Sequence, residues 1–132
     1  MSEPVILERQ PYRGMDPWEN LEPHMLPGVS RFSTESVAAM ADRNLVHYNV
    51  RVRINRDLLE PPNVSGMRVF IQGIPAHLRP VAGTPVAAYA AGQLVPVVVD
   101  WGGRIGIPNA SGLDPRDFSD IGFSLTTVRR QP

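Results

Sequence analysis

Three aspartates at three-residue steps form the densest group of chemically active side chains in this sequence. They lie in the segment Asp114-Pro115-Arg116-Asp117-Phe118-Ser119-Asp120, and Asp100 precedes it. Carboxylates so placed could bind Ca²⁺ or serve as an acid and a base. However, the spacing lacks the alternating oxygen ligands and the central glycine of a calcium loop. An aspartate before a proline is also typical of a turn that the carboxylate caps, so we expect a structural loop and no metal.

A second group of polar side chains follows one predicted strand. Arg51 and Arg53, together with His47, Asn49 and Asn55, alternate there with apolar residues. Arginine makes forked contacts, so this stripe could bind phosphate, an acidic sugar or the carboxylates of a partner. It could equally be the solvated face of an antiparallel sheet. We predict that Arg51 and Arg53 form a basic interface.

The remaining catalytic residue types are scattered. His24, His47 and His77 are not at metal-ligand spacing, and the chain has no cysteine. No nucleophile elbow, P-loop or dinucleotide-binding fingerprint occurs. The sequence therefore predicts a protein that is not an enzyme and that binds no cofactor and no metal.

These side chains must be positioned by strands, because the apolar residues recur with a period of two. Val46 to Ile54 alternates strictly between apolar and polar residues, as a half-buried strand does. Gly92-Gln93 predicts a hairpin turn, and Pro96 after it predicts an edge position or a bulge. Further strands are predicted at the following segments: 67–72, 86–91, 94–100, 104–107 and 121–129.

One short helix is predicted at about residues 34–43. Ser33 or Thr34 supplies an N-cap oxygen, and Val37, Met40 and Ala41 share one face of such a helix. The fold prediction is therefore mainly β: a small antiparallel sandwich or barrel, residues 33–132, with one short helix and an extended N-terminal arm.

The arm is defined here as residues 1–32. Five prolines at nearly even intervals exclude a long helix from it, and the apolar residues scattered among them are unlike those of a flexible linker. The arm either lies on a neighbouring subunit or wraps its own domain. For the first case we predict these interface anchors: Tyr12, Trp18, Leu21, Met25, Leu26 and Phe32.

Composition narrows the class of protein. A chain of 132 residues with 42% hydrophobic residues fits one domain. The net charge is zero, which predicts no general affinity for nucleic acid, although residues 1–42 are net acidic and residues 43–79 net basic. The sequence shows no signal-peptide pattern and no apolar run that spans a bilayer, so we expect synthesis in the cytoplasm and no membrane partner.

In its composition and overall organisation the chain is similar to small structural proteins of bacteriophage particles. The shared features are the absence of cysteine, the extended arm and the compact β domain that follows it. The resemblance implies a capsid-decorating or tail-associated protein of the virion, homo-oligomeric and bound to other structural proteins of the particle. Two alternatives stay open: a carbohydrate-binding β-sandwich that uses Trp101 and the aspartate-rich loop, and a small enzyme that uses the same loop.

Overall fold

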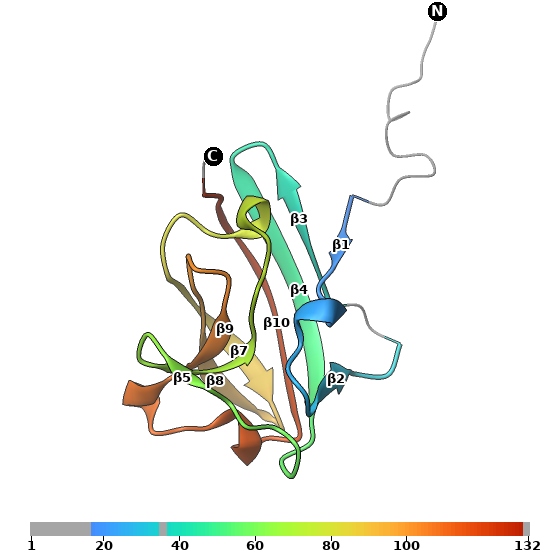
Figure 1. Cartoon of the computed structure of the whole chain (residues 1–132), viewed down its shortest axis with the longest axis vertical. Helices are drawn as coiled ribbons and strands as arrows, with labels where there is room; N and C mark the ends of the chain where they lie inside the picture. Colours follow the sequence, from blue (N-terminus) through green and yellow to red (C-terminus); the bar gives the residue numbers. More distant parts are fainter. Residues whose placement is uncertain (1–16, 35–36, 131–132) are drawn as a thin grey trace, which may run out of the picture.

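Ten strands form one antiparallel sheet that curls into a half-barrel in the computed structural model, which describes residues 17–34 and 37–130 (Figure 1). The strand order is β1-β3-β4-β10-β7-β8-β9-β6-β5, and β2 pairs with β4. The strands are β1 (Glu19–Asn20), β2 (Val29–Arg31), β3 (Ala38–Asp42), β4 (Leu45–Ile54), β5 (Asn63–Val64), β6 (Met67–Ile71), β7 (Thr84–Ala90), β8 (Gln93–Val99), β9 (Ile105–Pro108) and β10 (Asp120–Val128). Short 3₁₀ turns connect them: η2 (Glu22–His24), η3 (Ala76–Leu78), η4 (Asn109–Ser111) and η5 (Pro115–Asp117).

The mainly β prediction is confirmed, because the described residues contain no α-helix of seven residues or more. Of the predicted antiparallel sandwich or barrel, the structure shows an antiparallel sheet that curls into a half-barrel. Along β4 the burial alternates as the period of two predicts, and β10 pairs with nine of its ten residues. The concave side of the sheet holds the core, which includes Val50, Val97 and Ile105.

The predicted helix at 34–43 is wrong. Residues 38–42 form strand β3, which pairs antiparallel with β4 from Ala38↔Asn49 to Asp42↔Leu45. Alanine and methionine favour helices in isolation, but the neighbouring strand offers a full ladder of backbone hydrogen bonds, and tertiary context overrides propensity. Arg43, at a φ of 57°, begins the tight turn between the two strands.

The hairpin of β7 and β8 is confirmed, with its turn one residue earlier than predicted. Ala90 pairs with Gln93, so Ala91 and Gly92 form the turn, with φ of 49° and 85°. Two consecutive positive φ angles are the signature of the type I′ turn that matches strand twist. Among residues 17–34 and 37–130, Pro96 pairs through β7 alone, because β9 pairs with β8 at Val98 and Val99. The prediction of an edge position is therefore confirmed.

A buried tyrosine joins η3 to the sheet. Tyr48 is 1% exposed and its hydroxyl donates a hydrogen bond of 2.5 Å to the carbonyl oxygen of Leu78. Burial raises the pKa of this hydroxyl above its usual value, because the charged form would lose its hydration. The hydroxyl therefore remains a donor throughout the physiological pH range.

The described part of the arm wraps its own domain. Leu26 N–H donates to Phe70 O at 3.2 Å and Gln72 N–H donates to His24 O at 3.0 Å, which attaches η2 to β6. A few residues later, β2 pairs with β4 from Val29↔Ile54 to Arg31↔Val52. Residues 24–31 thus link strands from opposite halves of the sheet order.

Gly28 allows this crossing. Its φ is +95°, and a Cβ placed on it would lie 2.5 Å from the backbone nitrogen of Leu59. Any larger residue would meet backbone atoms that cannot give way, in a conformation that side chains rarely adopt. The glycine therefore lets the segment pass close against the loop that follows β4.

Leu21 tests the structural role of residues 17–32. Its side chain is fully buried in the core, so we expect Leu21→Ala to lower the free energy of unfolding by about 2–5 kcal/mol, through lost burial and the cavity left behind. Leu58→Ala is the matched control, since that side chain is 62% exposed. Urea denaturation measures both; equal stabilities for the two variants would contradict the intrachain packing.

Candidate interaction surface

The convex side of the sheet carries a row of five residues that are direct cross-strand neighbours. Phe32 N–H donates to Arg51 O at 3.2 Å, which continues the β2–β4 ladder. The next pairs are Arg51↔Gly122, Gly122↔Tyr89 and Tyr89↔Leu94. Directly paired residues point to the same side of a sheet. The outer row, as we name it, is therefore Phe32, Arg51, Gly122, Tyr89 and Leu94.

One end of the outer row is a stack of arginine on an aromatic ring. The guanidinium of Arg51 lies 4.3 Å from the centre of the Phe32 ring, and that of Arg53 lies 5.0 Å from it. Arg51 also pairs with Asp120 at 3.3 Å. The structure thus brings together Phe32 from the arm and Arg51 and Arg53 from β4, all predicted as interface residues, and Phe32 is half-buried beneath the two cations.

Gly122 leaves a gap in the row that Arg51 fills. A Cβ on Gly122 would lie 2.7 Å from Cδ of Arg51. The stem of the arginine therefore runs flat over β10. Its apolar part adds to the surface between Phe32 and Tyr89, as long charged side chains commonly do.

The other end of the row, at Tyr89 and Leu94, is apolar, although the solvent side of a sheet is normally polar. The solvent side of the β7–β8 hairpin presents three cross-strand pairs: Pro85↔Val98, Ala87↔Pro96 and Tyr89↔Leu94. Tyr89 is 55% and Leu94 is 72% exposed. By contrast, the outer positions of β4 and β10 include Asn49, Ser124 and Thr126. Contiguous exposed apolar side chains are typical of an interaction site.

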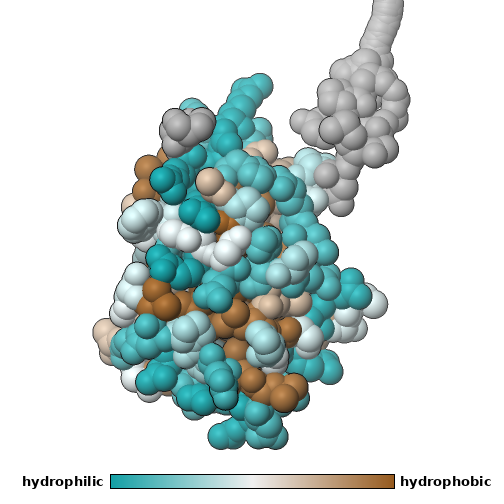
Figure 2. All heavy atoms as spheres, viewed as in Figure 1, coloured by the Kyte–Doolittle hydropathy of each residue, from teal (hydrophilic) through white to brown (hydrophobic). Residues whose placement is uncertain are grey.

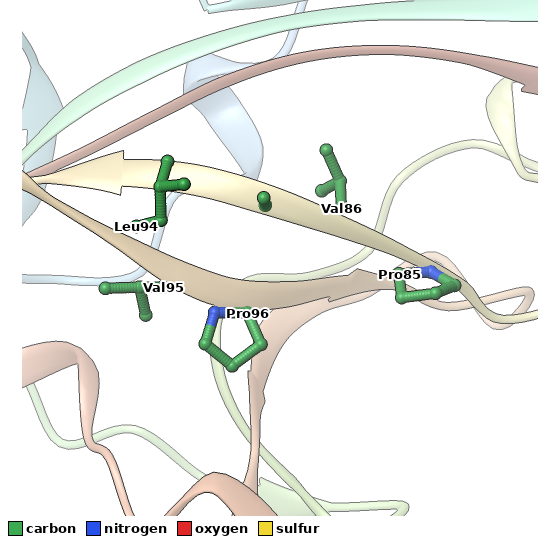
Figure 3. A pocket seen from close by; sticks show the side chains of 6 residues that line it. Pro85, Val86, Leu94, Val95 and Pro96 are labelled. Atoms are coloured by element: carbon green, nitrogen blue, oxygen red, sulfur yellow. The ribbon is translucent and has the colours of Figure 1, made fainter.

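A shallow depression of about 380 Å³ lies on this hairpin. Both strands contribute to its lining, as Figure 3 shows. The lining residues are all apolar: Pro85, Val86, Ala87, Leu94, Val95 and Pro96. On the face drawn in Figure 2, apolar side chains gather mainly in the lower half of the molecule, away from the C-terminal end. The surface is therefore divided into regions of different polarity.

The other predicted anchors have different surroundings. Leu21 is buried in the chain's own core, and Met25 and Leu26 are partly buried against it. These three side chains therefore contribute to the packing of the chain's own core. Trp18, directly before β1, is 37% exposed. Tyr12 lies outside the described residues.

The three aspartates of the acidic loop do not converge. Asp114 Oδ1 accepts from the backbone N–H of Arg116 at 2.8 Å, and Asp117 Oδ2 accepts from the backbone N–H of Asp114 at 2.9 Å. Asp120 faces Arg51 instead. The predicted capping turn is confirmed as a capping box at η5. Among the described residues, no three histidine or acidic side chains are arranged to hold a metal ion.

Each histidine also has its own surroundings. His47 Nδ1 lies 2.8 Å from Thr126 Oγ1, and His77 Nε2 lies 2.7 Å from Glu19 Oε2. His24 is at the end of η2, where its carbonyl accepts from Gln72. They are therefore parts of separate surface contacts.

Trp101 forms a second exposed feature, in the connection between β8 and β9. The ring is 57% exposed, and the guanidinium of Arg130 lies 6.0 Å from its centre. The preceding Asp100 is buried, pairs with Arg104 at 3.1 Å and accepts from the backbone N–H of Gly102. The Asp100 contacts fix this connection, so the tryptophan is held at the surface.

Neither protein-family models, nor curated proteins, nor solved structures provide a match to this chain. No helix within 17–34 and 37–130 has the length and hydrophobicity needed to cross a bilayer.

The capping aspartate gives a pH-dependent prediction. The hydrogen bond from the Arg116 side chain holds the pKa of Asp114 below its usual value of 3.8. A lowered pKa stabilises the fold above the unfolded-state pKa, and this contribution is lost as the pH falls through the folded-state value. We expect Asp114→Ala to cost about 1 kcal/mol at pH 7, as the loss of a cap does, and to cost less below pH 3.8.

Thermal unfolding at pH 7 and pH 3 measures this difference. Ser111→Ala is a control in the same loop, because its hydroxyl has no charge to lose. A cost for Asp114→Ala that stays constant with pH would contradict the charge-assisted cap.

Proposed function

We propose that this chain is a non-enzymatic assembly protein of a large symmetric particle, such as a bacteriophage capsid or tail. Its partners are further copies of itself and other structural proteins of the same particle. The observation that supports the proposal is the apolar outer face of the β7–β8 hairpin, continuous through the outer row with the stack of Arg51 and Arg53 on Phe32.

The chemistry of this surface favours a protein partner. Aromatic residues and arginine are enriched at protein interfaces, and charged residues are depleted at their centres. The outer row follows this pattern, with Tyr89 and Leu94 at its apolar end and the charge of Arg51 at the other. The arginine end would form the rim of such an interface and the hairpin its centre.

Self-association gives the mechanical function. Subunits that bind each other through complementary surfaces close into rings or extend into lattices, according to the rotation between them. The virion is the location that this proposal implies after synthesis in the cytoplasm. The chain's contribution is then adhesion between neighbours, and no reaction is needed.

Leu94 is the residue on which we test this proposal. We expect the protein to form oligomers at rising concentration, and we expect Leu94→Glu to weaken their association about thirty- to a thousand-fold, as the loss of an interface anchor worth about 2–4 kcal/mol does. Sedimentation equilibrium measures the association. Leu58→Glu is the matched control, because Leu58 is equally apolar and 62% exposed in the loop after β4. A protein that stays monomeric at high concentration would overturn self-association.

Carbohydrate binding is the second candidate, favoured by the exposed ring of Trp101. Such a module would bind glycans as a free monomer. On this candidate, Trp101→Ala abolishes binding to immobilised glycans while Leu94→Glu leaves it unchanged. On the assembly proposal we expect no glycan binding by either variant or by the parent protein, and a glycan array measures this directly.

A further inference from the structure

We propose that the outer row binds the segment Glu3-Pro4-Val5-Ile6-Leu7-Glu8 of a second copy of this chain. The inference rests on the proposed self-association and names the part of the neighbour that is bound. Residues 1–16 lie outside the described residues, and their sequence contains an apolar triplet with a glutamate close to each end. The outer row has apolar side chains at one end and arginines at the other, so the triplet can lie on the hairpin with one of its two glutamates, Glu8, toward the arginines.

The distance between the apolar and charged groups of the outer row can be matched by the distance between Ile6 and Glu8 in the segment. Leu94 and Arg51 are three strand spacings apart in the row, about 14 Å at 4.8 Å per strand. An extended chain rises about 3.3 Å per residue, so Ile6 on the hairpin places Glu8 roughly 7 Å nearer the arginines. The long side chains of Glu8 and Arg51 cover the remaining distance. Pro4 favours the extended backbone that such a contact needs.

The size of the hairpin face favours a segment over a whole subunit. A stable interface buries about 800 Å² on each partner. Three cross-strand pairs, of which the largest members are 55% and 72% exposed, offer on the order of a few hundred Å². An extended segment can follow such a narrow surface, and further contacts along the arm can add to the total.

The position of the chain's own arm favours a second copy as the source. Glu19 pairs with Ala39, which pairs with Tyr48, which pairs with Leu125. The arm therefore enters the sheet on the far side of β4 and β10 from the hairpin. To reach its own hairpin, the segment would cross the polar outer positions of those strands, among them Asn49 and Ser124. The segment of a neighbour can approach the hairpin directly.

Disulfide trapping tests this inference, because the chain has no cysteine of its own. Ile6→Cys and Leu94→Cys are prepared as separate full-length proteins and mixed under mild oxidation. A disulfide forms only when the two Cα atoms come within about 7 Å. We expect a mixed dimer on a non-reducing gel. A mixture of Ile6→Cys with Leu58→Cys is the matched control, in which we expect no dimer above the random background.

Other outcomes overturn the inference in distinguishable ways. If the mixture gives no dimer but the double variant Ile6→Cys/Leu94→Cys forms an intrachain disulfide, the chain's own arm occupies the row. If Leu94→Cys alone gives dimers and the mixture adds none, two hairpin faces contact each other. If no disulfide forms while Leu94→Glu still weakens association, the segment is not the occupant. In the last two cases the proposed assembly function stands without this inference.

Discussion

The fold depends on backbone hydrogen bonds that residues 24–32 make to strands in opposite halves of the sheet order. Leu26 bonds to β6, and β2 bonds to β4. Without these hydrogen bonds, the two halves of the curled sheet would not be linked, and the apolar residues on its concave side would be exposed. The same segment brings Phe32 beside Arg51. The same residues, 24–32, therefore cover the core and place Phe32 in the outer row.

The strands could be predicted where a single strand carries its own signal. Along β4 the alternation of apolar and polar residues marks both the buried side and the solvent side, because each strand position has a fixed direction. Pro96 marked an edge for a similarly local reason, since proline cannot donate to a ladder. The capping turn at Asp114 also depends on residues only three positions apart.

Features that depend on register could not be predicted. β3 reads as a helix because its alanines and methionine carry no strand pattern, and only the ladder with β4 determines its state. The outer row joins four strands and Phe32, the residue after β2, and no local pattern predicts which of these residues become neighbours. One signal was present: the continuous apolar run from Val86 to Ala91 left no polar residue for the solvent side of β7.

The flat course of Arg51 over Gly122 also affects how this surface can evolve. A side chain at 122 would displace the arginine stem from β10. A larger residue at 122 therefore requires the side chain at 51 to move or to be shorter. The two positions are distant in the sequence but adjacent in the fold. In homologous chains we therefore expect a substitution at one to be accompanied by a substitution at the other.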